Sequence, residues 1–185
     1  MRNFYEEYIN WSNRPSDFNE HMPTLYNLME TTKNKRSVEF GVGFGQSTRA
    51  FLAALEKIGG TLRSYDIVPH EGILELFADA QEAGIDAKFI QESTLDCTIE
   101  ETDILLVDSH HTYEQVKGEL RDEVTSKVTS YIIFHDTELF GDHGQDPGSR
   151  GILPAINEFL ETHPEWAVKE KYTNNNGLWI LWRVL

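Results

Sequence analysis

The stretch VEFGVGFGQST, residues 38–48, restricts the possible folds more than any other part of the sequence. An apolar run ends here in three glycines within five residues, Gly41, Gly43 and Gly45, and a polar segment typical of a helix start follows. Glycines at a strand end leave room for a ligand or another backbone to approach the chain closely. The stretch therefore predicts a strand, a ligand-binding turn and a helix in succession.

Apolar and amphipathic segments alternate along most of the chain, which is typical of a parallel sheet with helices on both faces. Asn176 and Gly177 precede the apolar run LWILWRVL and indicate a C-terminal β-hairpin. The expected fold is therefore an α/β, Rossmann-like, doubly wound sheet that is mostly parallel and ends in an antiparallel hairpin. The expected strands cover residues 36–40, 61–67, 87–91, 103–107 and 131–135, and the expected helices cover 46–58, 72–83, 113–127 and 151–162.

The length of 185 residues suits one domain, which we expect to cover residues 1–185. The first 35 residues contain two helical pieces and no strand. We expect this segment to form a helical cap that packs on the sheet edge or covers the site as a lid.

The formal net charge of −15 would repel polyanions. Nucleic acid and anionic membranes are therefore poor partners, and a small-molecule partner is expected. The chain has one cysteine, Cys97, and its N-terminal stretch lacks the features of a signal peptide. These features predict a cytoplasmic protein, and no surface pattern indicates an oligomeric state.

Two acidic residues narrow the choice of ligand. Asp66 ends the second expected strand, where a carboxylate can accept hydrogen bonds from both hydroxyls of a ribose. Nicotinamide dinucleotides and S-adenosylmethionine (SAM) both carry a ribose. Glu39 lies two residues before the first glycine, where it would repel a pyrophosphate and attract the ammonium group of SAM. These residues favour SAM.

The motif E-F-G-V-G-F-G followed by S-T, together with Asp66, resembles motif I and the acidic loop of the class I SAM-dependent methyltransferases. The resemblance implies a seven-stranded sheet whose C-terminal hairpin is antiparallel, as the sequence pattern also predicts. It also implies a turn near the adenine after the third strand. The implied cofactor-binding residues are Glu39, Gly41, Gly43, Gly45, Ser47, Asp66, Ser93 and Asp108.

A second group of polar residues follows the fourth and fifth expected strands. Asp108 and the pair His135 and Asp136 should emerge side by side at the carboxyl edge of the sheet. The segments D-S-H-H-T-Y-E and F-H-D-T are similar to a subgroup that includes cephalosporin hydroxylase-like and macrocin O-methyltransferase-like proteins. This resemblance implies Asp108 and Asp136 as ligands of Mg²⁺ or another divalent cation, although catechol-type enzymes carry Asp-Asn where this chain has His-Asp.

The predicted activity is SAM-dependent methyl transfer, class EC 2.1.1, to a small-molecule acceptor and most naturally to a hydroxyl group. Such a reaction needs alignment of the reactants and removal of a proton, by a metal or by His110 or His111 as general base. Asp108, His111 and His135 are the expected catalytic residues. Three alternatives stay open: a hydroxylase-like metal enzyme of the same fold, a non-catalytic cofactor-binding domain and an NAD-dependent dehydrogenase.

Overall fold

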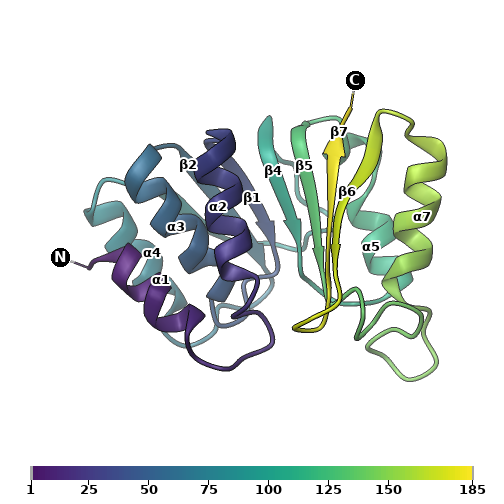
Figure 1. Cartoon of the computed structure of the whole chain (residues 1–185), viewed down its shortest axis with the longest axis horizontal. Helices are drawn as coiled ribbons and strands as arrows, with labels where there is room; N and C mark the ends of the chain where they lie inside the picture. The colour runs from purple at the N-terminus through teal and green to yellow at the C-terminus, as the bar shows by residue number, and fades with distance from the viewer. Residues whose placement is uncertain (1, 185) are drawn as a thin grey trace.

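The computed structural model describes residues 2–184 and consists of one seven-stranded sheet with helices on both faces (Figure 1). The strand order is β3-β2-β1-β4-β5-β7-β6, and the pairs among β1 to β5 are parallel whereas β7 runs antiparallel to both β5 and β6. This is the predicted fold. The strands are β1 Arg36–Phe40, β2 Thr61–Asp66, β3 Asp86–Gln91, β4 Thr102–Val107, β5 Val128–His135, β6 Trp166–Tyr172 and β7 Leu178–Arg183.

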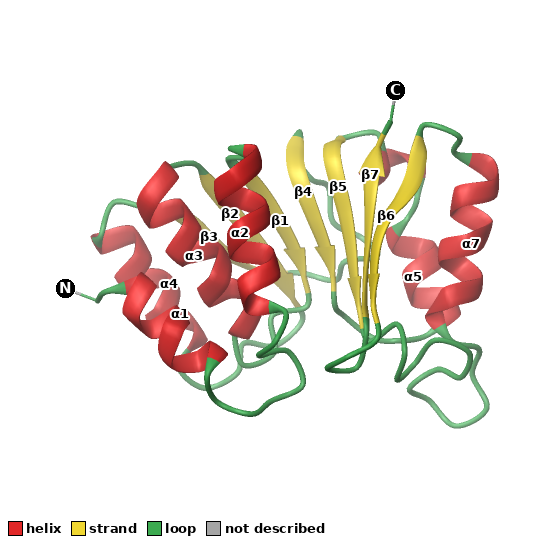
Figure 2. Cartoon of the chain, viewed as in Figure 1, coloured by secondary structure: helices red, strands yellow, loops and turns green. Residues whose placement is uncertain are grey.

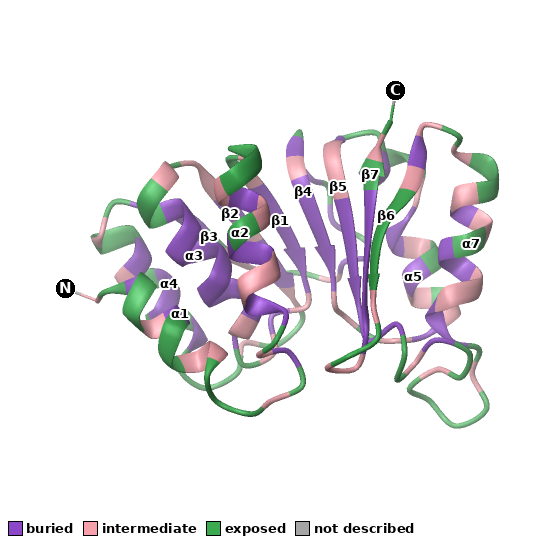
Figure 3. Cartoon of the chain, in the orientation of Figure 1, coloured by how far each residue is buried: buried purple, intermediate pink, exposed green. Residues whose placement is uncertain are grey.

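Two apolar clusters, one on each face of the sheet, form the core. Helices α1 to α4 cover one face, and α5 to α7 cover the other (Figure 2). The central strands are buried on both faces, whereas β6 at the sheet edge is mostly exposed (Figure 3). The helices are α1 Phe4–Ser12, α2 Met22–Thr32, α3 Gln46–Ile58, α4 Ile73–Glu82, α5 Tyr113–Glu119, α6 Asp122–Thr125 and α7 Ile152–Thr162.

The predicted helix over residues 113–127 is wrong in its length. Arg121 adopts an extended conformation (φ −61°, ψ 150°) and separates α5 from α6. Its guanidinium donates hydrogen bonds to the carbonyl oxygens of Gly118 (3.0 Å) and Thr94 (2.9 Å), which holds the break in place. The chain then enters β5 at Val128, three residues before the predicted start.

The N-terminal segment forms two helices, as expected, but they do not pack on the sheet edge. Both α1 and α2 lie against α3, and α2 shares the apolar cluster of that sheet face (Figure 1). The rings of Tyr8 and Tyr26 stack between the two helices with centroids 4.9 Å apart. Only the connecting segment between α1 and α2 reaches the carboxyl edge of the sheet, where Asp17 lines a cavity.

The C-terminal hairpin also reaches this edge. Its turn places Asn175, Asn176 and Gly177 at φ values of 47°, 68° and 91°, which agrees with the predicted Asn-Gly turn. The Asn176 carbonyl accepts a hydrogen bond from the backbone N–H of Glu138, which follows β5. The hairpin therefore fixes the loop after β5. None of the helices described within residues 2–184 has the length and apolar character needed to cross a membrane.

Candidate active site

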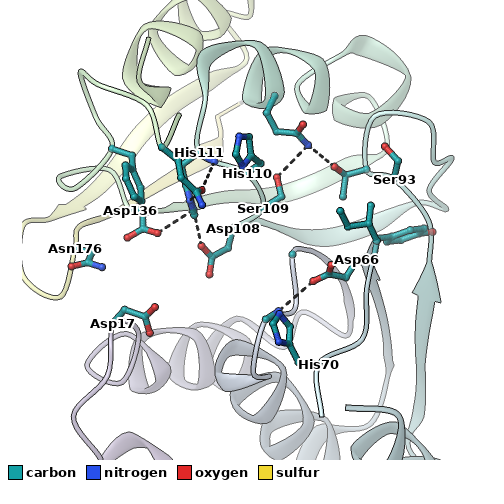
Figure 4. A pocket seen from close by; sticks show the side chains of 18 of the residues that line it. Asp17, Asp66, His70, Ser93, Asp108, Ser109, His110, His111, Asp136 and Asn176 are labelled. Carbon is teal, nitrogen blue, oxygen red and sulfur yellow. Dashed lines mark hydrogen bonds and ion pairs between the residues drawn. The ribbon is translucent and has the colours of Figure 1, made fainter. Parts of the chain in front are cut away.

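A cavity of about 790 Å³ opens at the carboxyl ends of the parallel strands (Figure 4). Its walls come from the turns after β1 to β5, from the α1–α2 connection and from the hairpin turn. A smaller cavity of about 240 Å³ adjoins it and shares Asp17, Gly43, Asp108, His111 and Asp136 with it. This edge is where doubly wound sheets bind their ligands.

The glycine turn forms one wall, and its glycines serve different purposes. Gly41 has φ +85°, and a Cβ there would lie 2.1 Å from the Asp108 carbonyl oxygen, so the strand ends of β1 and β4 touch at this point. Gly43 has φ +49°, but a Cβ there would meet nothing within 4 Å because the residue faces the cavity. Gly41 is therefore required for packing, and Gly43 leaves space for a ligand.

Asp66 at the end of β2 stabilises this turn. Its Oδ2 accepts hydrogen bonds from the backbone N–H groups of Val42 (2.8 Å) and Gly43 (3.3 Å), and its Oδ1 accepts one from Val68 (3.2 Å). Asp66 also lines the cavity. The carboxylate thus fixes the turn and remains at the position predicted for contact with a ribose.

Glu39 lies beneath the glycine turn and lines neither cavity. Its side chain is completely buried and accepts hydrogen bonds from the hydroxyl groups of Ser47 (2.5 Å), Thr48 (2.9 and 3.1 Å) and Ser64 (2.5 Å). Burial raises the pKa of Glu39 to about 7, although the three hydroxyl groups favour its ionised form. Direct contact between Glu39 and a bound ammonium group stays a prediction.

The other wall carries a cluster of two carboxylates and an imidazole. His111 Nε2 lies 3.2 Å from Asp108 Oδ1 and 3.1 Å from Asp136 Oδ2. Burial of Asp108 opposes its ionisation, but the nearby charges of His135 and His111 outweigh burial and lower its pKa to about 2. Burial likewise opposes the charge on His111, yet Asp108 and Asp136 raise the pKa of this imidazole. The contact between Asp108 and His111 therefore favours the charged form of both groups.

His135 lies behind this cluster and lines neither cavity. Its Nδ1 lies 3.2 Å from Asp108 Oδ1, and its Nε2 lies 3.1 Å from the carbonyl oxygen of Asp17 and 3.2 Å from that of Asn175. All three partners are hydrogen-bond acceptors, so both ring nitrogens donate and the ring is an imidazolium. Burial lowers the pKa of His135, but Asp108 and Asp136 raise it to about 10.

Asp136 has two unusual features. Its backbone adopts the left-handed conformation (φ 58°), which few residues other than glycine adopt and which often marks functional sites. Its side chain is nine-tenths buried, and Oδ1 has no hydrogen-bond partner among residues 2–184. Donor atoms of Asp108, His135 and Asp136 all lie within 4.8 Å of one another. The two carboxylates suit a divalent cation, whereas the protonated ring of His135 has no lone pair left for one.

The structure places the remaining predicted residues at different depths. Gly45 is the N-cap residue of α3 and lines neither cavity. Ser47 lines the smaller cavity and donates a hydrogen bond to Glu39, and Ser93 lines the larger cavity. The structure thus brings most of the predicted cofactor residues to one wall and leaves Glu39 and Gly45 as support for that wall.

Sequence reasoning missed a buried polar network at the end near β3. Glu119 is completely buried, and its Oε1 accepts hydrogen bonds from Thr94 (2.5 Å), Ser109 (2.5 Å) and Gln115 (2.9 Å). Burial raises the pKa of Glu119 despite these bonds. The sequence does hold one signal for its burial. Glu119 lies three residues after the apolar Val116, and residues three apart share one face of a helix.

Sequence reasoning also missed Gln145, Phe140 and Asn176, which line the cavity. Gln145 Oε1 lies 3.1 Å from His111 Nδ1, and the Phe140 ring stacks on the His111 ring with centroids 5.0 Å apart. The local sequence around these residues carries no signal for such contacts, because each one joins segments far apart in the chain.

Comparison with known families agrees with this geometry. The family described as "Methyltransferase domain" matches residues 38–137, which is more than half of the chain and runs from the glycine turn to the residue after Asp136. The chain belongs to this methyltransferase family. The assignment to the SAM-dependent methyltransferases made from the sequence motif is therefore confirmed. A search of curated proteins found no significant match.

Solved structures of methyltransferases have the same fold. A Podospora anserina methyltransferase with bound S-adenosylhomocysteine (SAH) has a TM-score of 0.65 and 16% identity, over 99% of this chain and 89% of that one. A putative caffeoyl-CoA O-methyltransferase from Staphylococcus aureus has a TM-score of 0.67 and 14% identity, over 99% and 93%. A Streptomyces achromogenes O-methyltransferase of tomaymycin synthesis, bound to SAM, has a TM-score of 0.64 and 14% identity, over 99% and 90%. At identities this low, these structural matches show that the chain shares the fold of these methyltransferases.

Proposed function

We propose that this chain transfers a methyl group from SAM to a hydroxyl group of a small molecule. The observation that carries the proposal is a single cavity with two different walls. One wall is the glycine turn held by Asp66, and the other is the cluster of Asp108, His111 and Asp136. Methyl transfer needs such an arrangement, since the methyl donor and the nucleophile must be aligned in one enclosure.

The charge of the cavity favours SAM over a dinucleotide. Within residues 2–184, no lysine or arginine lines either cavity, so a pyrophosphate would find carboxylates and no strong cation. SAM carries a sulfonium and an ammonium group, which these carboxylates attract. In the proposed pose, Asp66 binds the ribose hydroxyls, Gly43 lies beneath the cofactor, and Ser93 lies near the adenine.

The acceptor hydroxyl would bind at the cluster of Asp108, His111 and Asp136. Asp108 holds His111 and His135 in place and keeps its own negative charge, so the cluster can bind a hydroxyl by hydrogen bonds. His111 is the group that reaches the cavity, while His135 acts from behind as a positioning residue. The carboxylates are the hydrogen-bond acceptors of the cluster, so they would hold the acceptor hydroxyl by its proton, and the proton released on methyl transfer would pass to solvent through the open cavity.

The carboxylates of Asp108 and Asp136 fit a divalent cation by their donor type and their spacing, whereas the protonated ring of His135 offers no lone pair to one. A bound cation would lower the pKa of the acceptor hydroxyl. Asp108 and Asp136 would hold it.

Isothermal titration calorimetry of the purified protein with SAM, SAH and NAD, each with and without Mg²⁺ or Mn²⁺, tests the proposal. We expect micromolar binding of SAM and SAH and no heat from NAD. A cation-dependent change that EDTA reverses would identify the cation. Absence of SAM and SAH binding would overturn the proposed function.

A matched pair of variants tests the cofactor wall. Asp66→Asn should weaken SAH binding about tenfold or more, because it disturbs the turn and the ribose contact together. Asp96→Asn removes the same charge from an exposed residue that lines neither cavity, so SAH binding should stay unchanged. Equal effects of the two substitutions would contradict the assigned role of Asp66.

A further inference from the structure

The cavity walls carry an uneven set of charges. Among the described residues that line the two cavities there is no lysine or arginine, and the basic side chains are histidines. Asp66 and Glu92 lie at the cofactor end, near β2 and β3. Three further carboxylates, those of Asp17, Asp108 and Asp136, face the other end. The acceptor end of the proposed active site is therefore acidic.

The imidazoles neutralise only part of this charge. His111 and His135 pair with Asp108 and Asp136, as described above. Asp17 is exposed and forms no ion pair within residues 2–184, although its carbonyl oxygen is fixed by His135. Figure 4 shows Asp17 on the side of the cavity opposite Asp136 and Asp108, with its carboxylate directed into the open space. One carboxylate thus remains without a partner opposite the reacting cluster.

Asp136 contributes a further negative charge to this end of the cavity. Its nine-tenths buried side chain lines both cavities, and its Oδ2 faces His111. Its Oδ1 lacks a hydrogen-bond partner among the described residues but is shielded from the cavity. Asp17 is therefore the carboxylate of this end that is open to a ligand.

The same end also has apolar surface. Leu139 lines the cavity and is about half exposed (54%), and the neighbouring Phe140 ring stacks on His111. An apolar or ring-shaped body can pack here while polar groups face the carboxylates. The loop after β5 provides this surface, and the hairpin turn holds the loop in place.

We infer that the acceptor is a hydroxyl compound with an apolar body and a protonated amino group, which Asp17 binds. The inference rests on the proposed methyl transfer and adds the substrate class. Anionic acceptors, including carboxylated phenols and acyl-CoA thioesters, would face the unpaired carboxylate of Asp17 and bind weakly. Asp17 is then a residue that determines specificity.

Matched sets of hydroxyl compounds that differ only in charge test this inference. One set is dopamine, 4-(2-hydroxyethyl)catechol and 3,4-dihydroxyphenylacetate, and the second is glucosamine, glucose and glucuronate. Thermal shift in the presence of SAH measures binding, and transfer of a radiolabelled methyl group from SAM measures turnover. In at least one set, the amine should bind about tenfold more tightly than the anion, and the neutral compound should lie between them.

The outcomes separate this inference from the proposed function. Equal or reversed preference for the anion would overturn the inference. Stabilisation by SAH without a response to either amine would also overturn it and leave the methyltransferase proposal intact. Failure of SAH itself to bind would overturn both.

Substitution of Asp17 tests the assigned residue. Asp17→Asn should reduce the preference for the amine over the anion about fivefold, and Asp17→Lys should reverse it, while SAH affinity changes less than twofold. Asp17 is exposed, so both variants should fold. Asp96→Asn is the matched control and should retain the preference of the unsubstituted protein. An unchanged preference in Asp17→Lys would overturn the role of Asp17.

Discussion

The two walls of the cavity are built in different ways. The cofactor wall comes from one continuous stretch, residues 39–48, held by Asp66 from the next strand. The opposite wall combines segments that lie far apart in the chain, which bring together Asp17, Asp108, Asp136 and Asn176. Local backbone geometry thus shapes the first wall, and tertiary packing shapes the second. The first should be sensitive to backbone changes and the second to single charges.

The largest expected effect is at Gly41, and Gly43 is its matched partner. Gly41→Ala places a Cβ against the Asp108 carbonyl at positive φ, so we expect a loss of about 4 kcal/mol in the free energy of unfolding. Gly43→Ala meets open space and should lose only about 1 kcal/mol, the cost of its backbone conformation. Urea unfolding measures both.

Gly43→Ala should instead weaken SAH binding about tenfold, because its methyl group enters the cavity. Calorimetric titration of the folded variant measures this. Similar unfolding free energies for the two variants, or unchanged SAH affinity in Gly43→Ala, would contradict the division of roles between these glycines.

The buried carboxylate beneath the turn should make stability depend on pH. The pKa of Glu39 rises from 4.5 to about 7 on folding, so the folded state favours its neutral form. The resulting stabilisation is complete below pH 4.5 and is lost as pH rises through 7. Relative to Glu39→Gln, the unsubstituted protein should lose roughly 3 kcal/mol between pH 4.5 and pH 8.

Urea unfolding of both proteins without ligand, at a series of pH values, measures this difference. Ser64→Ala is a useful companion, because it removes one hydroxyl donor and favours the neutral form of Glu39 further. A constant difference between the unsubstituted protein and Glu39→Gln across this pH range would show that folding does not raise the pKa of Glu39.

The reacting wall should respond to loss of a single charge. Asp108→Asn removes the carboxylate that both His111 and His135 contact, so methyl transfer should fall about a hundredfold or more. Radiolabelled transfer to the best compound of the matched sets measures this. SAH affinity should change less than tenfold, and a rate close to that of the unsubstituted protein would favour a non-catalytic binding domain.

The same contrast explains how far sequence could predict the structure. The glycine spacing, Asp66 and the Asn-Gly turn are local patterns. The structure has each of them at its predicted place, after β1, at the end of β2 and in the C-terminal hairpin. Asp108 and Asp136 were predicted to meet because parallel strand ends share an edge, and their donor atoms do lie together.

The acceptor end could not be predicted in the same way. The conformation of the α1–α2 connection depends on contacts such as the His135 bond to the Asp17 carbonyl, which joins residues 118 positions apart. A glutamate in a helix usually faces solvent, so residue type alone gives no reason to expect Glu119 in the interior. Its place in the polar network becomes visible only when its helix face is seen to be buried. The break at Arg121 likewise depends on the distant carbonyl of Thr94.

The smallest expected effect is at Gln145, which contacts the reacting cluster from one side only. Gln145→Leu removes the hydrogen bond at His111 Nδ1, so the imidazole is less firmly oriented and methyl transfer should slow about threefold to tenfold. Asp146→Asn, at the next residue, removes the negative charge beside exposed His110 and leaves His111 bonded to Gln145, so its rate should stay within twofold. Steady-state kinetics at saturating SAM compare the two variants. Because Gln145 orients a residue of the acceptor wall, its loss should lower kcat and leave SAH affinity unchanged, whereas a loss of SAH affinity would assign Gln145 to the cofactor wall.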